Sequence, residues 1–341
     1  MATAIQHDPV PMSIDPTYHE VRPPDNPRLP YEDAYGPEYW EYRRRWNENP
    51  KEHRVERFPI HLDLEITNAC NLKCPHCYRT LALEKGTFGR QGLMSWELFQ
   101  KCIDEGAEKG LCSVKFNYMG EPLMHPQLCE MIRYAKEKGI VEVMFNTNGT
   151  LLTDQLSRDI ILAGLDKIIF SFDAIDPELY HKLRYPATLD DVVARIRRFC
   201  EIKQELGKRF PITRVSMVKM SDNAHEVEQF IEYWKPIVEL VTFVDYHNPQ
   251  GYDTVAGRKL TPNTRTRFAC AQLWQRMFIW WNGKITLCCG DYEGRHAMGN
   301  ALQSSLEEIW TSRQYQMLRD WHVAGQYHRI EICKNCQMNI V

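Results

Sequence analysis

Three cysteines, Cys70, Cys74 and Cys77, stand close together in the sequence, separated by three and then two residues. They follow the apolar residues 60–66, which predict a strand, so the thiols occupy a loop at a strand end. A four-iron cubane held by three thiolates keeps one iron free of protein. An open coordination position distinguishes a reactive metal site from a structural one. The alternatives are a zinc site and unrelated core thiols.

The twelve cysteines of this 341-residue chain are unevenly distributed. Five lie between Cys270 and Cys336, in addition to the three at the first site. A disulfide scaffold is the alternative interpretation, but such scaffolds are usually small and secreted. The uneven placement favours metal or cluster ligation. The other four cysteines lie in periodic segments and are interpreted as buried core thiols: Cys102, Cys112, Cys129 and Cys200.

Composition excludes several classes of protein. The formal net charge of -3 gives no global electrostatic case for nucleic acid or an acidic membrane as partner. No apolar run approaches the roughly 18 residues that a membrane span needs. The N-terminus lacks the charged-then-apolar pattern of a signal peptide. We therefore expect a cytoplasmic protein.

The first 57 residues are expected to form an irregular arm, because ten of the 19 prolines fall within residues 1–59. A short helix is predicted over residues 37–47, rich in aromatic side chains. Its arginines at 43–45 suggest RNA binding as an alternative. Docking of the aromatic face on the main domain is the favoured interpretation, since no other basic cluster supports nucleic acid.

From residue 60 onward, strand and helix patterns alternate. Strands are predicted at 60–66, 113–118, 142–147, 167–173, 212–220 and 238–246, and helices at 95–109, 127–138, 153–163, 189–206 and 225–234. Such alternation indicates parallel strands joined by right-handed crossovers. The two α/β candidates are an open doubly wound sheet and a partial (β/α)6 TIM-type barrel, which we favour. In both, functional groups gather at the carboxyl ends of the strands.

The alternation stops near residue 249. Residues 250–266 are polar and predict a linker. A hairpin is expected from segments 276–281 and 284–288 around Asn282-Gly283, and a helix near 306–321. The expected domains are therefore an N-terminal arm (1–57), a partial barrel (58–249) and a small C-terminal domain (250–341).

The Cys-x3-Cys-x2-Cys motif after the first strand of an α/β repeat resembles the radical S-adenosylmethionine (SAM) superfamily, over roughly residues 58–336. The resemblance implies a [4Fe-4S] cluster on Cys70, Cys74 and Cys77, with SAM chelating the fourth iron. It implies that SAM is cleaved to methionine and a 5'-deoxyadenosyl radical, which abstracts a hydrogen atom from the substrate. It also implies a flavodoxin or ferredoxin-type electron donor.

The resemblance implies SAM-binding roles at several strand ends. Gly120, Glu121 and Pro122 resemble a Gly-Gly-Glu-Pro motif that binds the SAM amino group, although Met119 replaces the first glycine. A simple turn is the alternative interpretation of Gly120-Glu121-Pro122. A strand-to-helix turn is likewise the alternative for Asn148-Gly149, after the third predicted strand. The further candidates for the SAM pocket are His76 near the adenine, Asn146 and Asn148, Ser171 and Asp173 for the ribose, Arg184 for the carboxylate, and Ser216 with Val218 for the adenine.

Four C-terminal thiols form a second set: Cys270, Cys288, Cys333 and Cys336. Four cysteines also close a tetrahedral zinc site, so zinc is the alternative. The Cys-x12-Gly-x4-Cys opening resembles the SPASM extension of radical SAM enzymes, here in a shortened form that implies one auxiliary [4Fe-4S] cluster with four protein ligands. This spacing favours Cys288 over Cys289 as the ligand. Cys289 is then either a buried bystander or a thiol that donates a hydrogen atom.

The predicted function is hydrogen abstraction from a small polar substrate (a sugar, aminocyclitol or nucleoside), leading to dehydrogenation or epimerisation. Asp245 and His247, at the end of the last strand, are candidates for substrate contact or proton transfer. A peptide-modifying maturase is the alternative, although residues 1–57 look too irregular for the leader-binding domain that such relatives often carry. A non-enzymatic, zinc-stabilised binding protein is the third hypothesis.

Overall fold

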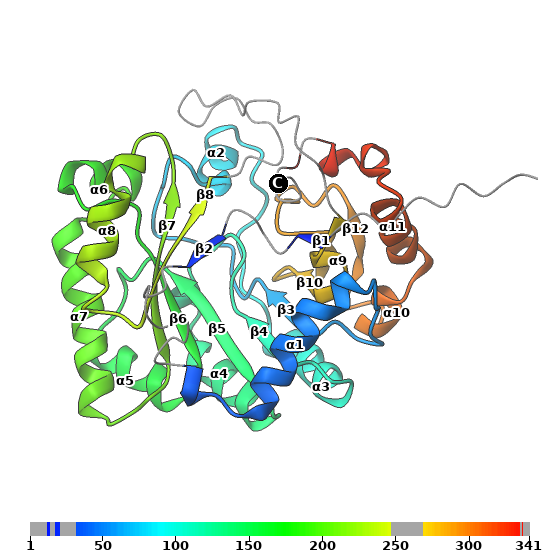
Figure 1. The fold of residues 1–341 in the computed structure, drawn as a ribbon, viewed down its shortest axis with the longest axis horizontal. Coiled ribbons are helices and arrows are strands. Elements are labelled where there is room, and N and C mark those ends of the chain that lie inside the picture. Colours follow the sequence, from blue (N-terminus) through cyan, green and yellow to red (C-terminus); the bar gives the residue numbers. More distant parts are fainter. Residues whose placement is uncertain (1–11, 14–17, 21–31, 247–268, 335, 337–341) are drawn as a thin grey trace, which may run out of the picture.

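The computed structural model describes residues 12–13, 18–20, 32–246, 269–334 and 336. A curved sheet with the strand order β12-β11-β10-β3-β4-β5-β6-β7-β8-β2 forms its centre (Figure 1). Six consecutive parallel strands match the predicted ones: β3 (His61–Leu64), β4 (Ser113–Lys115), β5 (Glu142–Thr147), β6 (Lys167–Ser171), β7 (Ile212–Lys219) and β8 (Leu240–Asp245). The predicted partial barrel is therefore confirmed.

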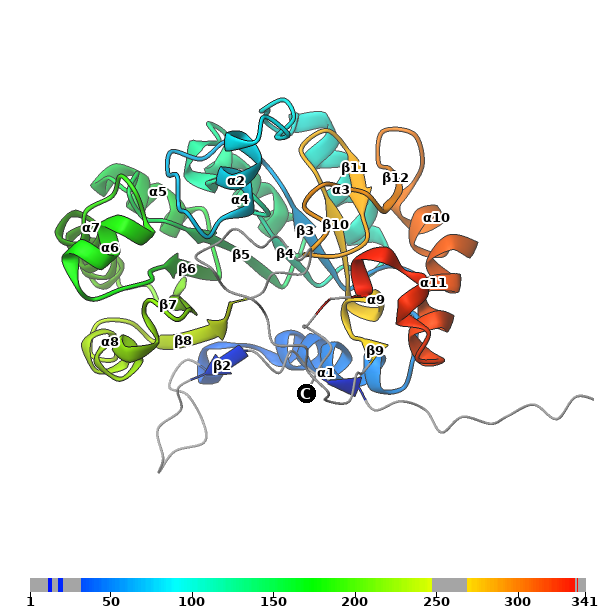
Figure 2. The ribbon, with the colours of Figure 1, turned by 90° about the horizontal axis from the view of Figure 1, so that it is seen from above.

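Helices cover the outer side of the arc of strands (Figure 2). The predicted helices are α3 (Trp96–Glu108), α4 (Leu128–Glu137), α5 (Asp154–Leu162), α7 (Leu189–Glu205) and α8 (Val227–Trp234). The Ser95 side chain caps α3 by accepting a hydrogen bond from the Leu98 amide. Short 3₁₀ turns occur at η1 (Glu32–Ala34), η2 (Pro122–Met124), η3 (Ala224–Glu226), η4 (Tyr327–Arg329) and η5 (Glu331–Cys333).

Two short helices of the barrel were not predicted, α2 (Tyr78–Glu84) and α6 (Pro177–Leu183). The first begins directly after Cys77, which gives no side-chain cap, so no start signal marks it. The second has clear signals, because the Asp176 side chain accepts from the Leu179 amide and Pro177 stands at the first helical position.

The C-terminal hairpin continues the barrel sheet. Strand β10 (Arg276–Ile279) pairs in parallel with β3 and antiparallel with β11 (Lys284–Thr286), which pairs with β12 (Ala297–Asn300). The single helix expected at 306–321 is two helices, α10 (Leu306–Trp310) and α11 (Arg313–Val323), because Ser312 caps the second. The unit is completed by β9 (Ala269–Cys270) and α9 (Gln272–Gln275). The expected domain boundary at 249/250 lies outside the described residues.

Two N-terminal segments form strands. β1 (Met12–Ser13) pairs with β9 in a separate two-stranded sheet, and β2 (Tyr18–Glu20) pairs with β8 at the edge of the main sheet. In the part of the chain that is described, no helix combines the length and apolar character that crossing a membrane requires.

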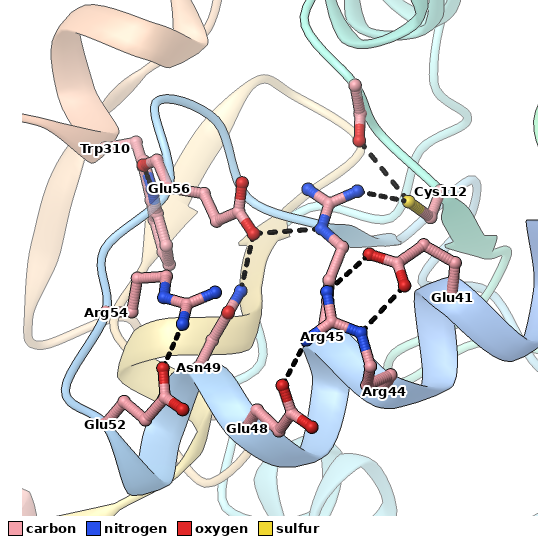
Figure 3. A network of polar contacts seen from close by, with 11 residues as sticks. Glu41, Arg44, Arg45, Glu48, Asn49, Glu52, Arg54, Glu56, Cys112 and Trp310 are labelled. Carbon is pink, nitrogen blue, oxygen red and sulfur yellow. Dashed lines mark hydrogen bonds and ion pairs between the residues drawn. The ribbon is translucent and has the colours of Figure 1, made fainter.

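Helix α1 (Pro37–Lys51) docks on the barrel through its aromatic face, as predicted. Tyr42 is 1% exposed, and the Trp46 ring lies 5.5 Å from the His61 ring at the start of β3. Figure 3 shows that Arg45 also points inward: its Nε donates to Glu56 Oε1 (2.9 Å), and its guanidinium contacts Cys112 Sγ (3.2 Å). The helix therefore covers the amino ends of the strands, opposite the thiol loop.

Candidate active site

A cleft of about 440 Å³ opens at the carboxyl ends of the strands. Its volume lies within the range of small-molecule sites. Its lining includes the three thiols of the first motif and eight of the residues expected around SAM, namely His76, Gly120, Glu121, Asn146, Asn148, Ser171, Arg184 and Val218. Residues expected around the cluster and SAM, up to 148 positions apart in the sequence (218 − 70, from Cys70 to Val218), therefore meet at one site.

The thiol loop is packed into the top of the barrel rather than exposed. Cys74 is buried, and Cys70 and Cys77 are half-buried. Burial raises the pKa of Cys70 to about 11 and that of Cys74 to about 12, and the neighbouring thiols add to both shifts. Thiolates in such a place need cationic partners, which the irons of a cluster supply.

Gly120 allows the end of β4 to approach this loop. A Cβ atom at this position would lie 2.1 Å from the Thr67 carbonyl oxygen and 2.8 Å from that of Ala69. The next amide, that of Glu121, donates to the Ala69 oxygen at 2.8 Å. The glycine is therefore required by close packing of backbone against backbone.

The Glu121 carboxylate is fixed by three donors: the Thr147 hydroxyl (2.7 Å), the Asn148 amide (2.8 Å) and the Leu123 amide (3.1 Å). Burial raises its pKa, although these hydrogen bonds oppose the shift. The Asn148 side chain in turn donates to Asn71 Oδ1 (2.9 Å) in the thiol loop. An oriented carboxylate at the edge of the cleft suits an ammonium ligand.

Asp173 lies behind the cleft wall. It is 0% exposed and does not line the cleft; its Oδ2 lies 2.6 Å from Arg184 Nε and 3.2 Å from His76 Nε2. Burial alone would raise the pKa of Asp173, but Arg184 and His76 hold it at about 2. This position favours orienting Arg184 and His76 over the direct ribose contact expected from the sequence.

The remaining SAM-pocket candidates divide into two groups. Asn146 Oδ1 is buried and has no hydrogen-bond partner, and the residue lines the cleft, so this oxygen is available to a ligand. Val218 also lines the cleft. Pro122 and Ser216 do not line it: Pro122 is buried at the start of η2, and the Ser216 carbonyl accepts from the Phe172 amide.

A second, smaller cavity gathers the C-terminal thiols: Cys270, Cys288, Cys289, Cys333 and Cys336 all line it. Burial raises the pKa of Cys270 to about 12, and it also raises the pKa of Cys288. Cys289 lines both this cavity and the SAM-side cleft, whereas Cys288 lines only the second cavity. This placement favours Cys288 as a ligand and puts Cys289 at the shared wall.

His322 also lines the second cavity, with its tautomer indicated by its contacts. Its Nδ1 accepts a hydrogen bond from the Cys270 amide (3.2 Å), so the proton of the neutral ring is on Nε2, 3.5 Å from Cys333 Sγ. Burial lowers the pKa of His322 to about 4, which keeps the ring neutral near pH 7. The ring therefore presents an N–H donor to the Cys333 sulfur.

Three aromatic side chains line the cleft near the C-terminal thiols. Tyr292 stacks on Tyr78 (ring centroids 5.0 Å apart) and lies 5.9 Å from Tyr118. The Tyr118 hydroxyl donates to the Cys288 carbonyl at 3.3 Å. Cys289 lines the same cleft as these three rings.

Asp245 and His247 are the candidates for substrate contact or proton transfer. Asp245 lines the cleft, and its carboxylate pairs with Lys219 at 2.8 Å. His247 lies outside the described residues.

Sequence reasoning missed the charged floor of the cleft, formed by Asp63, Lys115 and Arg276. The available signal was the alternation of polar and apolar residues over 61–66, which places every second side chain of β3 on one face. The high Val, Ile and Phe content of the other strands is typical of strands buried on both faces, and it gives no sign of a polar inner face.

Across the described residues, no group of three or more His, Cys, Asp or Glu side chains is arranged to hold a single metal ion. Each set of thiols is assigned to one site because its members line the same cavity.

Comparison with known proteins identifies the class. Residues 64–233 match the family model of the radical SAM superfamily, and residues 270–337 match that of the SPASM iron–sulfur cluster-binding domain. The chain belongs to the radical SAM superfamily and carries a SPASM domain.

Among curated proteins, the chain is 26% identical over 302 residues to the tungsten-containing aldehyde ferredoxin oxidoreductase cofactor-modifying protein of Pyrococcus furiosus, covering 76% of this chain and 83% of that protein.

Two solved structures share its fold. The first is BtrN in complex with AdoMet and 2-DOIA, with a TM-score of 0.56, 16% identity and coverage of 83% of this chain and 94% of BtrN. The second is Streptococcus suis SuiB bound to the precursor peptide SuiA, with a TM-score of 0.61, 16% identity and coverage of 92% of this chain and 77% of SuiB. At this identity the likeness concerns the fold alone.

The cofactors of the class are a [4Fe-4S] cluster with SAM and an auxiliary iron–sulfur cluster, and the residues present fit both. The thiol loop, the close approach at Gly120 and the unpartnered Asn146 oxygen form a cradle at the first site, and the four ligand thiols line the second. When bound, the first cluster and SAM supply the radical that abstracts hydrogen, and the auxiliary cluster supplies a one-electron centre.

Proposed function

We propose that this radical SAM enzyme abstracts a hydrogen atom from a small polar substrate of the sugar, aminocyclitol or nucleoside type. The observation that carries the proposal is the polar floor of the cleft. Asp63, Lys115 and Arg276 form this floor, and they offer ionic and hydrogen-bonding partners to a hydroxylated molecule.

In this proposal the residues of the cleft and of the second cavity have distinct binding roles. Cys70, Cys74 and Cys77 hold the first cluster, Glu121 and Arg184 bind the SAM amino and carboxylate groups, and Asn146 accepts from the bound cofactor. Cys270, Cys288, Cys333 and Cys336 hold the auxiliary cluster. The electron donor is a flavodoxin or ferredoxin-type protein, and the expected location is the cytoplasm.

Cys289 determines which of two outcomes follows. Loss of one electron and one proton from the substrate radical gives a dehydrogenated product. Transfer of a hydrogen atom from the Cys289 thiol instead gives an epimer and leaves a thiyl radical, which one electron and one proton restore. Cys289 lines the cleft, and its sulfur accepts from Gln272 Nε2 at 3.1 Å, which fixes the side chain at the shared wall.

Deuterium transfer tests the proposal. Anaerobically reconstituted enzyme is given SAM, a reductant and candidate substrates deuterated at carbon, and 5'-deoxyadenosine is analysed by mass spectrometry. Deuterium in 5'-deoxyadenosine from a sugar, cyclitol or nucleoside supports the proposal. Transfer only from peptides would establish the alternative, a peptide-modifying enzyme, which the shared fold with peptide-bound SuiB keeps in view.

A further inference from the structure

Two cations lie at the floor of the cleft, on the two strands that flank β3. Strands β4 and β10 flank β3, and the register places Lys115 of β4 and Phe278 of β10 opposite Asp63. Arg276 is two residues from Phe278, so its side chain leaves the same face. Lys115, Arg276 and Asp63 all line the cleft, with His61 one layer deeper, opposite Arg276.

The charges at this floor do not balance. Asp63 Oδ2 lies 3.6 Å from the Arg276 guanidinium and 3.5 Å from His61 Nε2. The Lys115 ammonium makes no ion pair within 4.0 Å and donates no hydrogen bond among the described residues. The Nε atom of Arg276 is buried without a hydrogen-bond partner. One carboxylate thus stands against two cations, and an unpaired cation in a partly buried place is unfavourable without a ligand.

The other acidic side chains of the cleft do not supply the missing charge. Glu121 accepts hydrogen bonds from three donors, and Asp245 pairs with Lys219 at 2.8 Å. Arg214 adds further positive potential at Lys115. The field at the floor is therefore positive, and it attracts an anion.

Arg276 is also pre-oriented. Its guanidinium carbon lies 4.9 Å from the Trp46 ring of α1 and 5.8 Å from the Phe278 ring. Aromatic neighbours on a guanidinium limit its rotation and leave its N–H edge for a planar or tetrahedral oxyanion. The N-terminal helix thereby shapes the floor of the cleft, since Trp46 belongs to it.

We propose that the substrate carries a compact oxyanion, a phosphate or a carboxylate, and that Lys115 and Arg276 bind this group at the floor of the cleft. This inference rests on the proposed function and narrows it. A phosphorylated or acidic sugar, or a nucleotide, satisfies the floor, whereas a cationic aminocyclitol does not. The anion anchors one end of the substrate, and the rest extends toward the SAM-side residues and Cys289.

Binding of simple anions tests the proposal without a known substrate. Inorganic phosphate and acetate are titrated by isothermal calorimetry into reconstituted enzyme saturated with SAM. Wild type is expected to bind at least one of the two saturably, and the tighter one indicates whether the substrate is a phosphate ester or a carboxylic acid. Lys115→Met and Arg276→Gln should each weaken this binding about tenfold or more, whereas Lys115→Arg should retain it.

The matched control is Lys208→Met. Lys208 is exposed and does not line the cleft, so its loss should leave anion binding unchanged. Equal binding by wild type and Lys115→Met, or no saturable binding of either anion by wild type, would overturn the inference. So would equal losses in Lys115→Arg and Lys115→Met, because a role in packing alone does not depend on charge. The deuterium-transfer test of the proposed function is independent of this readout.

Discussion

The two ends of the cleft satisfy their polar groups differently. At the SAM-side wall, Glu121, Thr147, Asn148 and Asn71 bind one another and fix the thiol loop. At the floor, Lys115 has no described partner. A wall whose Glu121 network is satisfied within the protein, with the Asn146 oxygen left for a ligand, suits a cofactor common to a whole superfamily. A floor with an excess of positive charge suits a ligand particular to this chain. The contrast suggests that cofactor and substrate specificity reside in separate elements of the barrel.

Replacing Cys70, Cys74 or Cys77 by Ala should have the largest effect. Each variant removes one of three ligands, so formation of 5'-deoxyadenosine from SAM should fall to the background of protein-free reactions. The measurement is anaerobic turnover with chromatographic detection. Cys129→Ala, which changes a half-buried thiol outside both cavities, is the control and should retain cleavage. Persistent cleavage in all three variants would refute the ligand assignment.

Gly120→Ala sharpens the view that the SAM-side wall is fixed by backbone packing. The added Cβ would lie 2.1 Å from the Thr67 oxygen, so the backbone must move. SAM cleavage should fall by about 100-fold, equivalent to about 2.7 kcal/mol of barrier. Gly89→Ala is the matched control, because nothing lies within 4 Å of its Cβ position. If both variants were equally active, close approach at Gly120 would not matter.

Substitutions of the C-terminal thiols should distinguish the two cluster sites. Cys288→Ala, Cys333→Ala and Cys336→Ala should lower iron from about eight to about four atoms per chain, with SAM cleavage in the absence of substrate retained. Cys289→Ala should keep about eight. Iron and sulfide analysis checks both statements. Loss of iron in Cys289→Ala but not in Cys288→Ala would exchange the roles of these two residues.

A prediction about stability, with no expected effect on SAM cleavage, concerns Glu65 at the end of β3. It is 0% exposed, and burial raises its pKa from 4.5 to about 8. A carboxyl group with a raised folded-state pKa stabilises the fold below its unfolded pKa, and this contribution declines as pH rises toward the folded pKa. Relative to Glu65→Gln, wild type should lose up to about 1.4 kcal/mol of unfolding free energy per pH unit between pH 5 and 8. Urea denaturation at several pH values measures this, and parallel pH profiles would contradict it.

The sequence predicted the SAM-side wall better than the floor. The wall depends on short motifs at strand ends, such as the three thiols and Gly120-Glu121, and strand order brings these together in any parallel barrel. The floor depends on which face of each strand points inward and on a hairpin more than 200 residues away: Arg276 reaches Asp63 only because β10 pairs with β3. No short sequence motif predicts the pairing of β10 with β3. No short motif predicts the contact between Trp46 and Arg276 either.

The position of Asp173 illustrates the same limit. The sequence places Ser171 and Asp173 on one face of a strand, which is correct for an extended strand. In the structure β6 ends at Ser171, so the two side chains no longer share a strand face. Asp173 turns behind the wall to bind Arg184 and His76. Alternation predicts direction only while the strand continues.

A crossed binding experiment tests the division between wall and floor most directly. Dissociation constants for SAM and for the tighter of phosphate and acetate are measured with reconstituted wild type, Arg184→Gln and Lys115→Met. The account predicts that Arg184→Gln weakens SAM binding about tenfold and leaves the anion within about twofold, and that Lys115→Met does the reverse. If each variant weakened both ligands equally, cofactor and substrate would not be bound by separate parts of the cleft.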